Sequence, residues 1–146
     1  MLNVSGTDSA MSENARASNL PAIAVIGSLN ADLTTYTSRI PDGGETLHAN
    51  SFKIGNGGKG GNQACACAKL SRTSKNINNE SATIKMIGVV GNDAHGELLL
   101  QDLKASGVDT SRVAIRDDVE TGVAVILVAE TNARVAFYSV LAPTTL

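Results

Sequence analysis

The residues best suited to chemistry lie in one glycine-rich segment, Gly55-Asn56-Gly57-Gly58-Lys59-Gly60-Gly61-Asn62-Gln63-Ala64, which leads into a helix-forming run. Glycine lacks Cβ, so it permits positive φ and lets a ligand approach the backbone closely. A helix that opens on such a segment leaves several free N–H groups and the positive end of its dipole. Lys59 adds a charged donor, and Asn62 adds an amide that both donates and accepts. Such a site suits a phosphate group or the hydroxyls of a polar ligand.

The glycine-rich segment also partly fits two nucleotide-binding motifs. Gly55, Gly57 and Gly60 fit the dinucleotide-binding pattern G-x-G-x-x-G, but that pattern needs a buried strand directly before it, and residues 48–54 are mixed and polar. A Walker A loop is excluded because Lys59 is followed by glycine instead of Ser or Thr. A glycine-rich turn without a ligand remains an alternative. We favour recognition of sugar hydroxyls at a helix start.

Asn30 and Asp32 form a second polar pair. They follow a continuous apolar run at residues 22–26, which is typical of a strand buried on both faces of a parallel sheet. Ligands of such sheets bind beyond the carboxyl ends of the strands. Residues two apart in an extended chain face the same way, so this amide and carboxylate can hold neighbouring hydroxyls of a sugar. A turn that uses both side chains for local hydrogen bonds is the alternative.

The composition excludes several classes of protein. The chain has 146 residues, enough for one ordinary domain, and its net charge of −2 comes from interspersed acids and bases, so no basic patch indicates a nucleic-acid partner. Aromatic residues are only 3% of the chain, too few for a base-stacking platform. No apolar stretch is long enough to span a bilayer. Cys65 and Cys67 are best explained as small buried helix residues in a reducing compartment.

The remaining segments alternate between strand and helix patterns, which predicts helices on both faces of a sheet. Asp93 is expected to cap a helix that ends at Gly107, and we prefer this to an acid–base pair of Asp93 with His95. Residues 1–20 are expected to be a disordered tail. The expected strands cover residues 33–36 and 46–54, which form a small flap, and then 83–90, 113–115, 121–128 and 134–141, with a turn at Asn132.

Several ordered motifs resemble those of the ribokinase (PfkB) family of carbohydrate kinases. Residues 57–64 resemble the first signature of that family, and residues 25–32 match a second stretch. Further matches lie at residues 41–46, 88–93 and 121–124, so the resemblance covers nearly everything from residue 22 to about residue 139. Within the family, the pairing of Asn-x-Asp with Gly-Gly-Lys-Gly-x-Asn is most similar to the ribokinase type.

The resemblance implies a fold, a reaction and a set of binding residues. The implied fold is α/β, of the three-layer α/β/α Rossmann-like type, with a mostly parallel sheet and a small lid of strands. By the same resemblance, residues 21–146 are expected to be the N-terminal part of such a kinase domain, including the lid. The implied reaction transfers the γ-phosphoryl group of ATP to ribose, with Mg²⁺ and a monovalent cation such as K⁺ in the full-length family. The implied ribose-binding residues are Asn30, Asp32, Gly58, Lys59, Gly60, Gly61 and Asn62.

The catalytic motif of the family is missing from this sequence. The general base of the family is an Asp within Gly-Ala-Gly-Asp, and no such motif occurs in the chain. The agreement also fails beyond residue 139. We therefore assign no catalytic, cofactor-binding or metal-binding residue, and we expect a truncated N-terminal part that is inactive alone.

The function hypotheses from the sequence fall into three classes. The first is an ATP-dependent kinase that converts D-ribose to D-ribose 5-phosphate. The second is a noncatalytic protein that binds sugar or forms a homodimer through the lid strands, and the third is a dinucleotide-dependent oxidoreductase. We expect a small sugar as partner, neither nucleic acid nor membrane, and a cytoplasmic or nuclear location. The sequence does not discriminate among ribose, other sugars and nucleosides.

Overall fold

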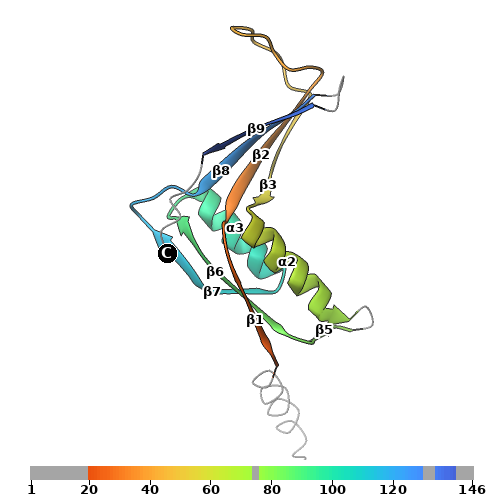
Figure 1. Ribbon diagram of the computed structural model, residues 1–146, viewed down its shortest axis with the longest axis vertical. Coiled ribbons are helices and arrows are strands. Elements are labelled where there is room, and N and C mark those ends of the chain that lie inside the picture. Colours follow the sequence, from red (N-terminus) through yellow and green to blue (C-terminus); the bar gives the residue numbers. More distant parts are fainter. Residues whose placement is uncertain (1–19, 74–75, 130–133, 141–146) are drawn as a thin grey trace, which may run out of the picture.

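The computed structural model describes residues 20–73, 76–129 and 134–140. They form two main sheets, one above the other in Figure 1, and two helices beside the lower sheet. Residues 1–19 of the expected tail and the turn expected at Asn132 lie outside the described residues. No helix in the described part of the chain has the length and apolarity needed to cross a bilayer.

The lower sheet, called the core sheet here, contains β1 (Ala22–Ile26), β6 (Thr83–Gly91) and β7 (Val108–Arg116), in the order β1-β6-β7. All three strands run parallel. Along β6 the side chains alternate between buried and half-buried, as expected for a strand with one covered face. β7 is longer than the predicted strand over residues 113–115 because it pairs with β6 almost from end to end.

The two helices are α2 (Lys59–Ser71) and α3 (Ala94–Ala105). Asp93 caps α3 and Gly107 follows its end with φ +80°, so both predicted helix boundaries are confirmed. A small ribbon of β4 (Arg72–Thr73) and β5 (Asn76–Glu80) lies between α2 and β6 in the chain. The half-buried Cys65 and Cys67 of α2 pack against the core and form no disulfide.

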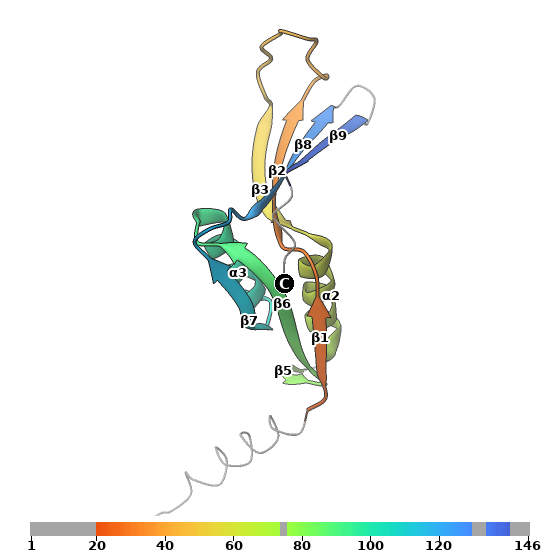
Figure 2. The ribbon, with the colours of Figure 1, turned by 60° about the vertical axis from the view of Figure 1, so that its left-hand side comes forward.

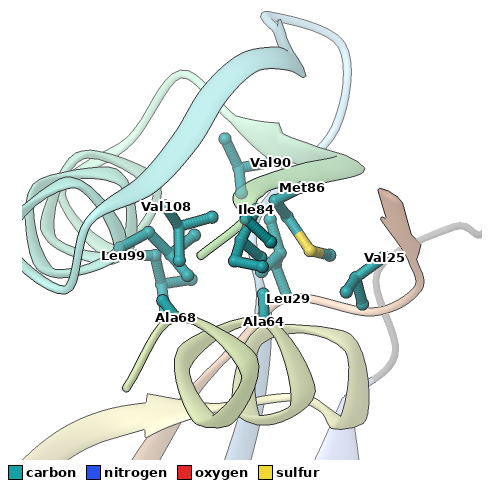
Figure 3. Close-up of a cluster of buried hydrophobic side chains, with 11 residues drawn as sticks. Val25, Leu29, Ala64, Ala68, Ile84, Met86, Val90, Leu99 and Val108 are labelled. Atoms are coloured by element: carbon teal, nitrogen blue, oxygen red, sulfur yellow. The ribbon is translucent and has the colours of Figure 1, made fainter. Parts of the chain in front are cut away.

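Both described helices pack on the same face of the core sheet, and their side chains meet in one cluster (Figures 2 and 3). The prediction of helices on both faces is therefore wrong for the described residues. Each helix has one narrow apolar stripe, and a single shared core satisfies both stripes. The cluster includes Ala64 and Ala68 of α2, Leu99 and Leu103 of α3, and Ile84, Met86 and Val90 of β6.

The prediction that β1 is buried on both faces is also wrong. Only Val25 of this strand is buried, whereas the side chains of Ile23 and Ile26 are 44% and 62% exposed. The reason is that β1 pairs with β6 along one edge only, and α2 contributes packing on one face. An apolar run therefore indicated the strand correctly but not the number of its covered faces.

The upper sheet, called the lid sheet here, has the order β3-β2-β8-β9 (Figure 1). Its strands are β2 (Asn30–Thr37), β3 (Ser51–Gly57), β8 (Gly122–Ala129) and β9 (Arg134–Val140). β2 begins at Asn30 and β3 extends to Gly57 because these two residues pair. Both predicted strands are therefore present, but the one over residues 33–36 was too short, and the one over residues 46–54 began too early and ended too early. The chain thus has the Rossmann-like α/β fold with a lid of strands that the sequence predicts.

A close approach of two glycines seats α2 against the end of β1. A Cβ atom on Gly60 would lie 2.7 Å from the carbonyl carbon of Gly27 and 2.8 Å from the Met86 Cε atom. Gly60 is buried, and the Gly27 N–H donates to the Ile87 carbonyl at 3.2 Å. The helix start therefore lies directly on the backbone of the strand, with no room for a side chain between them.

We predict that Gly60→Ala destabilises the chain, because inserting a methyl group into a filled contact typically costs about 1–3 kcal/mol. Gly55→Ala is the matched control, since a Cβ atom there would meet nothing within 4 Å. Urea unfolding followed by circular dichroism measures both changes. Equal midpoints for the two variants would contradict the packing described for Gly60.

Candidate functional site

The predicted sugar-binding residues lie on two elements that meet at one point, the start of β2 and the start of α2. Asn30 is the register partner of Gly57, the last residue of β3. Gly58 follows with φ +84°, and a Cβ atom on it would lie 2.4 Å from the Ser28 carbonyl oxygen. The structure therefore brings the beginning of the helix directly beside the beginning of the strand.

The carboxylate of Asp32 lies over Gly57. A Cβ atom on Gly57 would lie 2.0 Å from the Asp32 Oδ1 atom, so only glycine leaves room for this carboxylate. Asp32 is half-buried, and burial raises its pKa above the ordinary value. Within the described part of the chain, no hydrogen bond or ion pair holds its side chain. Its oxygens are thus available acceptors beside the start of α2.

Asn30 and Asp32 belong to the same strand and alternate with Ala31, which is buried. Their side chains therefore share one face of the lid sheet, as the sequence predicts. Asn62 lies in the first turn of α2, also as predicted, and both Asn62 and Lys59 are exposed there. These four residues remain the candidates for contact with a ligand.

Gly60 and Gly61 have a different structural role from the one expected. Both are buried, and a Cβ atom on Gly61 would lie 3.1 Å from the Leu29 Cδ2 atom. Their glycine identity is explained by the close packing of α2 on the core. Their predicted contribution to ligand binding, through the backbone, stays a prediction.

Ser28 is a contributor that the sequence analysis missed. Its hydroxyl accepts from the Lys59 N–H at 3.2 Å, and its carbonyl accepts from the Gly61 N–H at 3.2 Å. Two N–H groups that were expected to be free at this helix start are therefore used within the chain. The sequence feature that could have indicated this role is the position of Ser28, between the end of the first strand and the Asn30-x-Asp32 pair. In place of a ligand, Ser28 caps this end of the helix.

Asn56 is a further polar residue close to the site. Its Oδ1 atom is buried and has no hydrogen-bond partner in the part of the chain that the structure describes. Asn56 is the register partner of Ala31, so it lies on the face of the lid sheet opposite to Asp32. We therefore exclude it from the candidate sugar site.

The geometry also tests the dinucleotide-binding interpretation. Gly55 and Gly57 lie in β3, which is antiparallel to β2 and largely exposed. The dinucleotide pattern requires a buried parallel strand before its first glycine. The literal match of the glycines therefore occurs in the wrong structural context.

The family model described as pfkB family carbohydrate kinase matches residues 21–143. Ribokinase of Schizosaccharomyces pombe is 45% identical over 112 residues, which are 75% of this chain and 33% of that protein. Deoxyribokinase of Salmonella typhi is 42% identical over 106 residues, or 73% of this chain and 31% of that protein. The chain thus spans about a third of the length of the curated relatives that it matches.

Solved structures agree with these relatives. Arabidopsis thaliana ribokinase complexed with ribose and ATP matches with a TM-score of 0.70 and 32% identity, over 83% of this chain and 36% of that one. Ribokinase from Cryptococcus neoformans var. grubii serotype A in complex with ADP matches with a TM-score of 0.66 and 27% identity, over 88% and 39% of the two chains. Since the family model also matches well over half of the residues, the chain belongs to the pfkB family of carbohydrate kinases.

Proposed function

We propose that this chain is the sugar-binding N-terminal part of an ATP-dependent kinase of the ribokinase type, which converts D-ribose and ATP to D-ribose 5-phosphate and ADP. The observation that carries the proposal is the half-buried Asp32 carboxylate, which has no partner among the described residues and lies beside the start of α2. The similarity to ribokinases, one of them solved with ribose and ATP, supports it.

The proposed binding uses four side chains. The Asp32 carboxylate accepts hydrogen bonds from sugar hydroxyls, and the Asn30 and Asn62 amides donate and accept. Lys59 adds a charged donor from the first turn of α2. Hydroxyl donors would also compensate the burial of the Asp32 charge. Holding a sugar in one orientation matters because phosphoryl transfer depends largely on positioning and electrostatics.

ATP, Mg²⁺ and K⁺ are implied by the ribokinase type, but the residues described here do not fit their sites. Across residues 20–73, 76–129 and 134–140, no group of three or more His, Cys, Asp or Glu residues could hold a metal ion. The full sequence contains no Gly-Ala-Gly-Asp motif. In this proposal ATP supplies the phosphoryl group, the chain positions the sugar, and the chain alone produces no turnover.

We predict that Asp32→Ala weakens binding of D-ribose to the chain by at least roughly tenfold, because removing a carboxylate leaves the sugar hydroxyls and the site unpaired. Asp102→Ala, on the exposed side of α3, is the matched control. Calorimetric titration with D-ribose and with 2-deoxy-D-ribose measures the affinity and tests the specificity. Equal affinities of the Asp32 and Asp102 variants would refute the assignment.

The same carboxylate predicts a pH dependence with a defined sign. Burial raises the pKa of Asp32 in the free chain, and sugar hydroxyls that bind the carboxylate lower it again. Binding is therefore strongest above the pKa of the free chain and weakens as the pH falls through it. The ordinary pKa of Asp is about 4. As the pH is lowered from neutral to about 4, the affinity of the wild type for D-ribose should therefore fall, whereas the affinity of Asp32→Asn should stay constant. A parallel decline in both would assign the titration to another group.

A second candidate function, a noncatalytic protein that forms a homodimer through the lid, is favoured by one specific observation. Phe52, Ile54 and Val125 are 56%, 49% and 40% exposed. Ile54 and Val125 both pair with Leu33, and all four side chains lie on the face of the lid sheet opposite to Asp32. An apolar face of this kind is typical of an interaction surface. We propose that it pairs with the same face of a second copy.

For this candidate we predict that the wild-type chain elutes as a dimer or larger species and that Ile54→Lys shifts it toward the monomer, because a charge is buried at the contact. Ile115→Lys, at an exposed isoleucine of β7, should leave the association unchanged. Size-exclusion chromatography with light scattering measures all three chains. A monomeric wild type, or dissociation by both variants alike, would contradict the lid dimer.

A further inference from the structure

The joint between β6 and β8 is held by a compact network that the proposed sugar site does not include. Asp93 Oδ1 accepts from the Gly96 N–H at 2.8 Å, the usual bond of a helix cap. Asp93 Oδ2 accepts from the Thr121 N–H, also at 2.8 Å, across 28 positions of sequence. Thr121 Oγ1 in turn accepts from the Gly91 N–H at 2.9 Å. We call Gly91, Asp93, Gly96 and Thr121 the Asp93 clamp.

Two further hydrogen bonds join Asn92 to the end of β7 and the residue after it. The Asn92 N–H donates to the Arg116 carbonyl at 2.9 Å, and Asn92 Nδ2 donates to Asp117 Oδ1 at 2.7 Å. Together with the bond from Thr121 to Asp93, they attach the segment that leaves β6 both to the end of β7 and to the residue that precedes β8. Capping α3 needs only one carboxylate oxygen of Asp93. The second oxygen instead binds Thr121, which lies outside the helix.

Neither glycine of the clamp leaves room for a side chain. A Cβ atom on Gly96 would lie 2.3 Å from the Gly91 carbonyl oxygen and 2.9 Å from Thr121 Oγ1. A Cβ atom on Gly91 would lie 2.5 Å from Asp93 Oδ2. Thr121 is only 4% exposed. Burial raises the pKa of Asp93, but the N–H donors of Thr121 and Gly96 outweigh it and leave the pKa lowered, so the acceptor stays charged at neutral pH.

The clamp lies one residue away from the strand that supports the candidate sugar site. Thr121 is followed by Gly122, the first residue of β8, and Gly122 is the register partner of Asn30. Among the described residues, two other passages between the sheets run through glycines, Gly27 before β2 and Gly57-Gly58 after β3. Glycine restricts the backbone least, so the clamp is the passage with the strongest side-chain bonding.

We propose that Asp93 and Thr121 are positioning residues that fix the lid sheet relative to the core sheet, so that Asn30 and Asp32 are held against the start of α2; the part that concerns sugar rests on the proposed function. α3 also lies against β2, so the helix that Asp93 caps contacts the same strand. The clamp thus connects the N-terminal cap of α3 with the orientation of Asn30 and Asp32 on β2.

Two clamp variants and two controls test this. Asp93→Asn keeps one amide oxygen and loses an acceptor for one of its two N–H donors, and Thr121→Val keeps the side-chain shape but removes the acceptor of the Gly91 N–H. Thr121→Ser restores the hydroxyl. Asp118→Asn removes an exposed carboxylate of the same connection, which pairs with Arg116 instead of the clamp.

The first measurement is the distance between the two sheets. Spin labels are attached at Ser51→Cys in β3 and Asp102→Cys in α3, both exposed, in a Cys65→Ala, Cys67→Ala background. Dilution with unlabelled chain restricts electron–electron double resonance to distances within one molecule. The clamp variants should shift or broaden the distance distribution, whereas Thr121→Ser and Asp118→Asn should reproduce the wild type.

The second measurement is the affinity for D-ribose, which should fall roughly tenfold in the clamp variants, within the range typical of coupling between sites. Unchanged distances in folded Asp93→Asn and Thr121→Val chains would overturn the clamp, whatever their affinity. Distances that respond while even the wild type fails to bind ribose would retain the clamp and reject the proposed function. If Asp93→Asn fails to fold, the comparison of Thr121→Val with Thr121→Ser decides.

Discussion

The structure depends on a short stretch of backbone that has no room for side chains. Gly57 accommodates the Asp32 carboxylate, Gly58 lies against the Ser28 carbonyl with φ +84°, and Gly60 lies on Gly27. Each position requires glycine for a different reason: space for a charge, a left-handed backbone, and contact between two backbones. The same residues that bring α2 onto the core therefore create the space in which a carboxylate lies beside the helix start.

That carboxylate is a half-buried polar group that the described part of the fold leaves without a partner. A half-buried acid without a partner is unfavourable, and burial raises its pKa accordingly. Sites that break a local rule in this way are frequently functional. Asp93 provides the contrast, because its carboxylate is fully used by the N–H groups of Gly96 and Thr121. The Asp93 carboxylate is thus satisfied by the fold, whereas the Asp32 carboxylate is available to a ligand.

The sequence correctly predicted the features that depend only on residues close together in the chain. Alternation along an extended strand placed Asn30 and Asp32 on one face, and the cap pattern placed Asp93 at the start of α3. It could not predict contacts between distant segments, such as the bond from Thr121 to Asp93 or the use of helix N–H groups by Ser28. Nor does an apolar run state how many faces of its strand are covered, which is why the burial of β1 was mispredicted. Alternation of strands and helices likewise does not state which face of the sheet each helix covers, and α2 and α3 share one core.

In the proposed function, a sugar binds where the start of β2 meets the start of α2. Titration of the ¹⁵N-labelled chain with D-ribose, followed through its backbone amide signals, tests this most directly. We predict that the shifts concentrate at Asn30, Asp32 and residues 57–62, and that they vanish in Asp32→Ala. Shifts that concentrate on α3 and β7 instead, or that persist in Asp32→Ala, would contradict the claim.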